Sequence, residues 1–228
     1  MIDNNEHELA TARKTVGPED RVLTVMCDVS DSAQVTSAVN QVLGQFKRID
    51  ALVNNAGIAD FKPVTDTSFS TWSEILATNL NGPFLCSKAC LPTMLQQRSG
   101  AIVNITSISG LRASTLRTAY GTSKAALAHL TKQFAAELGH CGIRVNAVAP
   151  GPIDTAMAKQ VHSAEIPADY HDAVPLNRYG LEEEVASAIY FLCSDESSFI
   201  TGQEVCVDGG FGTTGIGLSS LRKDCPID

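Results

Sequence analysis

Short apolar runs alternate with longer segments of mixed polarity along this chain of 228 residues. Each run is dense in Val, Ile, Leu or Met, as expected for a strand that is buried on both faces of a sheet. Strands that alternate with helices are typical of βα units, which build a parallel sheet. Five strands are predicted, over residues 21–29, 49–57, 100–107, 143–151 and 202–210.

The segments between these runs place apolar residues at helical spacing. Val35, Val39 and Phe46, for example, lie on one stripe of a predicted helix. Asn79 to Pro83 interrupt the middle of another predicted helix. Helices are predicted over residues 6–17, 32–46, 72–95, 120–139 and 182–194.

The segment 152–180 is rich in Pro, His and Tyr and has no clear periodicity. It is long for a loop in a compact domain, so we predict that it forms a lid or a substrate loop. No internal repeat and no second domain are visible in the sequence. The fold prediction is a single α/β domain over residues 1–228, built on a doubly wound parallel sheet.

Composition and charge narrow the classes of partner. The net charge of −8 argues against a nucleic-acid surface, and no apolar run has the length of a membrane helix. The seven cysteines are odd in number and scattered, which favours reduced thiols in the cytoplasm. The five histidines lack ligand spacing, so we predict no metal site.

Tyr120 and Lys124 are the first candidates for chemistry. They are four residues apart on a predicted helix, hence on one face and within reach of each other. A free phenol titrates near pH 10, and a cation beside it favours the phenolate. Ser107 ends a predicted strand, at the edge where α/β sheets bind ligands, and its hydroxyl could bond a substrate carbonyl. A Tyr–Lys pair alone is more often a solvated pair.

The wider set of motifs resembles the short-chain dehydrogenase/reductase family over essentially the whole chain. This resemblance implies a Rossmann-like sheet and an NAD(P)-dependent oxidoreductase that interconverts a secondary alcohol and a ketone. The matching motifs, in family order, are Asp28-Val29, Asn54 to Gly57, Asn79, Ser107, Tyr120 with Lys124, Pro150-Gly151 with Thr155, and Val207 to Gly210.

The resemblance implies roles for four catalytic residues. Tyr120 would be the general acid/base, and Lys124 would lower its pKa and hold the nicotinamide ribose. Ser107 would orient and polarise the substrate carbonyl. Asn79 would hold a water that relays protons to Lys124, although a simple polar kink in a helix is the alternative.

The resemblance also implies a set of cofactor contacts. Asp28 would bond the adenine amine, unless it only caps the following helix, and Val29 belongs to the same motif. Asp3 falls where the family has the carboxylate that selects NAD over NADP, so NAD is the predicted cofactor. Besides these residues, Tyr120 and Lys124, the contacts are Asn54, Ala56 and Gly57 on the adenosine side and Pro150, Gly151, Ile153 and Thr155 around the nicotinamide.

The chain departs from the family pattern at its beginning. The family opens with a strand, a glycine-rich loop, a helix and a second strand, whereas residues 1–20 match the segment after that second strand. We therefore expect the first βαβ module, roughly 30 residues, to be absent and an opening to lie between strands 21–29 and 49–57. The glycines of 209–217 imitate the lost loop, but only 13 residues come after Gly215, which is too few for the rest of the module.

Several alternatives stay open. By resemblance the substrate is a 3-oxoacyl thioester or a small polyol or sugar. Arg112 and Arg117 flank the active strand end and could receive an acidic carrier protein, or could simply be solvated. The rival function is a catalytically silent remnant that cannot bind cofactor. Helices 72–95 and 120–139 carry more than one apolar stripe, which predicts a homodimer or homotetramer.

Overall fold

The main sheet has four parallel strands and carries helices on both faces. The computed structural model describes residues 1–17, 21–155 and 166–213. The strand order is β3 (Ala51–Asn54), β4 (Gly100–Ile105), β5 (Ile143–Pro150) and β6 (Glu204–Val207), with every neighbouring pair parallel. The predicted α/β doubly wound class is confirmed.

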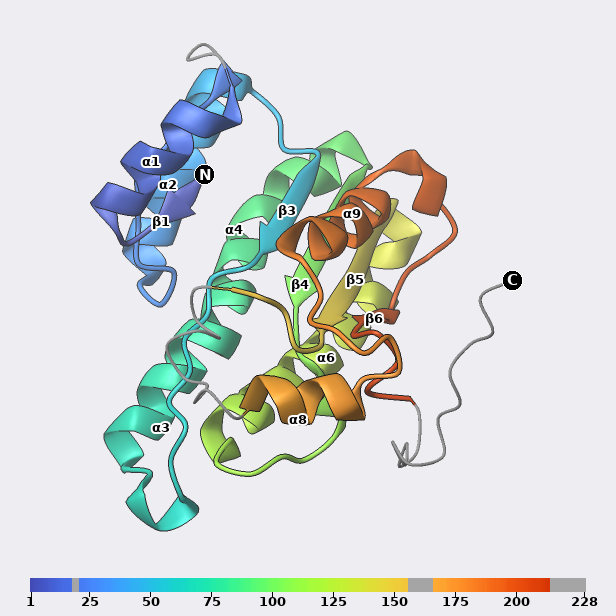
Figure 1. The fold of residues 1–228 in the computed structure, drawn as a ribbon. Coiled ribbons are helices and arrows are strands. Elements are labelled where there is room, and N and C mark those ends of the chain that lie inside the picture. Colours follow the sequence, from blue (N-terminus) through green and yellow to red (C-terminus); the bar gives the residue numbers. More distant parts are fainter. Residues whose placement is uncertain (18–20, 156–165, 214–228) are drawn as a thin grey trace.

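The two central strands, β4 and β5, are buried on both faces because their side chains alternate between two helical layers. On one face of the sheet, Ile102 of β4 and Val145 of β5 pack with Met94 of α4 (Gly82–Gln97), in the layer that also contains α6 (Thr118–Leu138). Val103 and Val148 face the other layer and pack with Leu192 of α9 (Glu182–Cys193). Figure 1 shows α9 on the opposite side of the sheet from α4 and α6.

A second, two-stranded sheet stands beside the main one. β1 (Ile2–Asp3) and β2 (Val25–Met26) are parallel, and α1 (Glu6–Val16) and α2 (Ser32–Phe46) accompany them. Cys27 and Val35 share a core cluster with Cys86 of α4, which attaches this unit to the rest of the fold. In Figure 1 these blue elements form a separate group next to α4.

The opening expected in the sheet is present but narrower than predicted. Residues Ile2–Asp3 already occupy the position beside β2, so β1 rather than β2 borders the opening. The predicted strand 21–29 shrinks to Val25–Met26, because its only ladder partner is two residues long. Within the described residues, β3 pairs only with β4, and Val53 in its middle is 39% exposed. Both sheets thus leave a strand edge without a strand partner there.

The interruption predicted at Asn79 to Pro83 is a π-helical turn. Helix α3 (Phe69–Leu76) runs into this turn, Ala77–Asn81, and continues as α4. The turn directs Asn79 into the interior, where it is fully buried. Position 82, the first residue of α4, requires a glycine, because a Cβ there would lie 2.8 Å from Val29 Cγ2. A larger residue would push the helix away from Val29, which follows β2. Such turns are frequent at functional sites.

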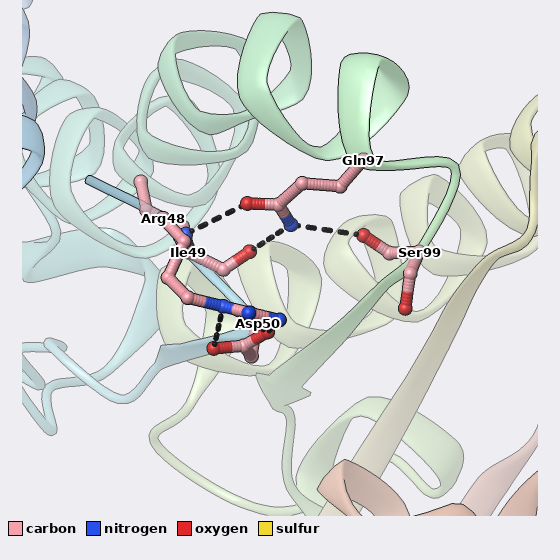
Figure 2. Close-up of polar contacts among 5 residues, drawn as sticks. All are labelled: Arg48, Ile49, Asp50, Gln97 and Ser99. Atoms are coloured by element: carbon pink, nitrogen blue, oxygen red, sulfur yellow. Dashed lines mark hydrogen bonds and ion pairs between the residues drawn. The ribbon is translucent and has the colours of Figure 1, made fainter. Parts of the chain in front are cut away.

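The carboxyl end of α4 is tied to the start of β3, as Figure 2 shows. The Gln97 amide accepts a hydrogen bond from Ile49 N at 3.1 Å and donates to Ile49 O at 2.8 Å and Ser99 O at 3.2 Å. Arg48 and Asp50 form an exposed ion pair at 2.6 Å beside it. These contacts fix where β3 begins and therefore where its carboxyl end delivers the following loop.

The remaining elements of the described chain are short. They are α5 (Ile108–Leu111), α8 (Ile166–Ala173) and three 3₁₀ turns, Val64–Asp66, Gly139–Cys141 and Asp195–Ser197. Helix α8 lies within segment 152–180, for which no element was predicted; residues 156–165 of that segment lie outside the described residues. None of the described helices combines the length and hydrophobicity that a membrane crossing requires.

Candidate active site

A cavity of about 640 Å³ lies at the carboxyl ends of β3, β4 and β5. Its walls come from the loops that follow these strands, from the start of α6 and from α9. Ser107, Tyr120 and Lys124 all line it. The structure therefore brings together three of the four predicted catalytic residues at the edge where α/β sheets bind ligands.

Ser107 and Tyr120 both line the cavity. Ser107 follows β4 and caps α5, where its hydroxyl accepts a hydrogen bond from Ser109 N at 3.1 Å. Burial raises the pKa of Tyr120, while the nearby Ser107 hydroxyl and the charge of Arg117 lower that pKa. The Phe61 ring packs edge-on against Tyr120, with 5.9 Å between the ring centroids. The effect of Ser107 on the Tyr120 pKa indicates that the two side chains lie close together on the cavity wall.

Lys124 is 4% exposed, and its Nζ donates a 2.7 Å hydrogen bond to Ile105 O at the end of β4. Burial lowers the pKa of this lysine to about 8. Its Nζ lies 5.6 Å from the Tyr120 ring centroid. We predicted that Lys124 lowers the pKa of Tyr120, but the structure does not bear this out. Ser107 and Arg117 are the groups that lower this pKa, and the increase caused by burial is larger than their combined effect.

Asn79 lies behind the cavity wall. Its amide accepts from Ile58 N at 2.8 Å and donates to Ile58 O at 2.9 Å and Ser123 Oγ at 3.1 Å. A Cβ on Gly57 would lie 3.3 Å from Asn79 Oδ1 and 3.4 Å from Lys124 Nζ. Asn79 therefore positions the loop after β3 close to Lys124. Its role in a water relay stays a prediction.

The predicted cofactor residues divide into two groups. Three lie away from the cavity wall. The Asn54 amide donates to Asn104 Oδ1 at 2.8 Å and to Ser87 Oγ, inside the protein. Val29 packs toward Gly82, and the Asp28 carboxylate accepts from Ser30. The residues that line the cavity as predicted are Asp3, Ala56, Gly57, Pro150, Gly151, Ile153 and Thr155, besides Tyr120 and Lys124.

Asp28 does not cap the following helix, which was the alternative considered for it, because another residue does so. Asp31 caps α2, because its carboxylate accepts from Ala33 N at 2.8 Å and Gln34 N at 3.1 Å. Asp28 instead stabilises the turn before that cap. Its proposed contact with adenine stays a prediction.

The sequence reasoning missed several residues of the cavity wall. Asn55 lines it in place of Asn54, and Phe61 and Tyr170 contribute aromatic rings. The period-two alternation of β3 distinguishes Asn54 from Asn55, since Asn54 continues the inward-facing positions. Tyr170 comes from α8, and no periodic signal marked that helix.

The glycines after β6 do not form an anion site over their described part. The Asp208 carboxylate accepts hydrogen bonds from Gly210 N at 3.0 Å and Gly212 N at 2.5 Å. A carboxylate that already occupies these N–H groups would repel a phosphate. Gly215 and Gly217 lie outside the described residues.

Similarity to known proteins agrees with this geometry. A family model described as enoyl-(acyl carrier protein) reductase matches residues 1–212. The 2-(S)-hydroxypropyl-CoM dehydrogenase 3 of Xanthobacter autotrophicus is 40% identical over 188 residues, covering 80% of this chain and 74% of that protein. The 3-oxoacyl-(acyl-carrier-protein) reductase FabG of Chlamydia trachomatis is 41% identical over 190 residues, covering 83% and 76%. The chain belongs to the short-chain dehydrogenase/reductase family.

A solved member of this family has closely similar coordinates. The gluconate 5-dehydrogenase of Burkholderia cenocepacia, in complex with NADP and tartrate, gives a TM-score of 0.87 at 30% identity. The match covers 94% of this chain and 85% of that one. Short-chain dehydrogenases/reductases are oxidoreductases that act on CH–OH groups and bind NAD(P), and this chain is such an oxidoreductase by family.

The cavity suits part of a dinucleotide. Asp3, which is exposed, lines the cavity together with Gly57 and Gly151. A Cβ on Gly151 would lie 2.6 Å from Asp208 Cα. Within the described residues, however, no glycine-rich turn opens a helix at this cavity. The described cavity wall therefore offers no such cradle for the pyrophosphate, and its contacts with the riboses and the nicotinamide stay predictions.

Proposed function

We propose that this cavity interconverts a secondary alcohol and a ketone by hydride transfer with a dinucleotide. The observation that carries the proposal is the meeting of Ser107 and Tyr120 on the cavity wall, with Lys124 buried one helical turn from Tyr120. The bound dinucleotide supplies the hydride in reduction and accepts it in oxidation. Proton transfer and orientation fall to the side chains of the chain itself.

Tyr120 and Ser107 act on one substrate oxygen. During reduction the Tyr120 hydroxyl gives its proton to the oxygen of the carbonyl as the hydride reaches the carbon, and during oxidation the phenolate takes the proton back. The Ser107 hydroxyl donates a hydrogen bond to the same oxygen and orients it. Lys124, held by Ile105 O, keeps further N–H donors for a ribose hydroxyl.

The proposed cofactor is NAD rather than NADP. Asp3 ends β1 at the cavity, where a carboxylate can accept hydrogen bonds from the ribose hydroxyls and repel a 2′-phosphate. The gluconate 5-dehydrogenase of Burkholderia cenocepacia binds NADP. Both nucleotides therefore belong in any assay.

Two substrate classes fit this proposal, a 3-oxoacyl thioester and a small polyol or sugar. They correspond to the activities for which two similar proteins are named, the 3-oxoacyl reductase and the gluconate dehydrogenase. The proposal is tested in a form of the protein that binds the dinucleotide, by offering both substrate classes with NAD or NADP and following reduced nicotinamide by absorbance. If that form of the protein turns over neither substrate class, the proposal is contradicted.

A catalytically silent protein is the second candidate. The observation that favours it is the opening between β1 and β3, together with the missing pyrophosphate cradle in the described residues. Retention of Ser107, Tyr120 and Lys124 in one cavity favours a catalytic site instead.

The cytoplasm is the proposed location, since the six cysteines of the described residues are all free thiols.

We expect a homodimer or homotetramer that pairs through α4 and α6. Phe84 is 40% exposed on α4 and lies 6.2 Å, between ring centroids, from Phe134 of α6. Cys86 and Leu127, by contrast, are buried within the chain. An exposed apolar stripe on paired helices is typical of an interface. Light scattering at micromolar protein should give the mass of two or four chains, and a monomer mass would contradict the expectation.

A further inference from the structure

Arg117 is a cation on the cavity wall that the mechanism above does not use. It stands directly before α6, three residues from Tyr120, and lines the cavity together with Phe61 and Tyr170. Its guanidinium carbon lies 4.2 Å from the Phe61 ring centroid, and its Nη2 donates a long hydrogen bond, 3.4 Å, to the Tyr170 hydroxyl. An aromatic face and a phenol thus hold this guanidinium in place.

The charge of Arg117 has no partner in the described part of the chain. Asp3 and Glu182 also line the cavity, but no described carboxylate lies within ion-pair distance of Arg117. A guanidinium has five N–H donors, and Tyr170 takes one of them. The Arg117 charge reaches the reacting group, since it lowers the pKa of Tyr120.

Arg112 provides an internal contrast. Its Nη1 donates to Phe211 O at 2.6 Å, and its guanidinium carbon lies 5.3 Å from the Phe211 ring centroid. Arg112 is not part of the cavity wall. Of the two arginines that flank this strand end, only Arg117 is placed to meet a ligand inside the cavity.

We propose that Arg117 binds a carboxylate carried by the substrate, so that the substrate is a small oxo acid or hydroxy acid. The inference rests on the proposed interconversion of a secondary alcohol and a ketone, and it adds a charged substrate class to the two given above. The planar fork of a guanidinium matches a carboxylate in a bidentate pair, and the Phe61 and Tyr170 contacts reduce the entropy lost when that pair forms. A docking site for a carrier protein would instead require cations on the outer surface.

The test compares an acid with its neutral amide. The ligands are 4-oxopentanoate and 4-oxopentanamide, and 3-oxobutanoate and 3-oxobutanamide, which place the charge at two distances from the ketone. Their affinities for the full chain are measured by saturation-transfer NMR, with and without NAD. The variants are Arg117→Gln, Arg117→Lys and, as the matched control, Arg112→Gln; thermal unfolding checks that each variant folds.

The unchanged chain should bind at least one acid about ten- to a hundredfold more tightly than its amide, since the hydrogen bonds are to a charged group. Arg117→Gln should reduce that preference to within about threefold, Arg117→Lys should retain part of it, and Arg112→Gln should leave it unchanged. Three results would overturn the proposal. These are equal affinity for the acid and its amide, failure of both acids to bind, and a preference for the acid that persists in Arg117→Gln. Because binding is measured without turnover, these failures are distinct from failure of the proposed oxidoreductase.

Discussion

Tyr120→Phe is expected to lower turnover at least about a hundredfold, because general acid/base catalysis typically contributes a factor of that size or more. The phenyl ring keeps its edge contact with Phe61, so the cavity should retain its shape. Dinucleotide affinity should therefore stay within a few-fold of the unchanged protein. Turnover is measured by nicotinamide absorbance, in a form of the protein that binds the dinucleotide.

Tyr190→Phe is the matched control for this variant. Tyr190 lies on α9 and is 75% exposed, away from the cavity wall, so loss of its hydroxyl should leave turnover unchanged. If Tyr120→Phe kept more than a tenth of the turnover, another group would have to carry the proton. Equal losses in both variants would indicate a general effect on folding.

The polypeptide of residues 1–228 is expected to bind NAD and NADP weakly or not at all. Pyrophosphate recognition relies on backbone N–H groups at a glycine-rich turn and on the positive end of the helix after it. The described cavity wall carries two cations, Lys124 and Arg117, but no glycine-rich turn that opens a helix. Loss of several charge-assisted hydrogen bonds, at about 1.5–3 kcal/mol each, weakens binding by several orders of magnitude.

Calorimetric titration of both nucleotides checks this expectation. The polypeptide 1–228 is compared with the same polypeptide preceded by a strand, a glycine-rich turn and a helix that can enter the opening between β1 and β3. The preceded form should bind with micromolar affinity. Micromolar binding by residues 1–228 alone would show that another part of the chain holds the phosphates.

The fold could be predicted well where the hydrophobic pattern decides the structure. Strands β4 and β5 are buried on both faces, so a continuous apolar run was sufficient to locate them. The length of strand β2 could not be predicted, since it depends on a partner, Ile2–Asp3, rather than on the sequence of β2 itself. Helix α8 carries no strong periodic signal, and its neighbours in the fold were not known from the sequence.

The site could be predicted from motifs where the motif itself fixes the geometry. Tyr120 and Lys124 share a helix face, and Ser107 ends a strand, so their meeting required only the sheet topology. The direction of the Tyr120 pKa shift was wrong, because it depends on burial and on Arg117, which local spacing does not reveal. The inward direction of Asn54, by contrast, follows from the period-two alternation along β3, which the sequence reasoning did not apply at this position.

The central claim is that Ser107 and Tyr120 act on one substrate oxygen. A double-mutant cycle on turnover, with Ser107→Ala, Tyr120→Phe and the double variant, tests it most directly. Residues that act as a unit are non-additive, so the double variant should be about as impaired as Tyr120→Phe alone. If the two losses simply multiplied, the hydroxyls would act independently, and the common site proposed for them would be contradicted.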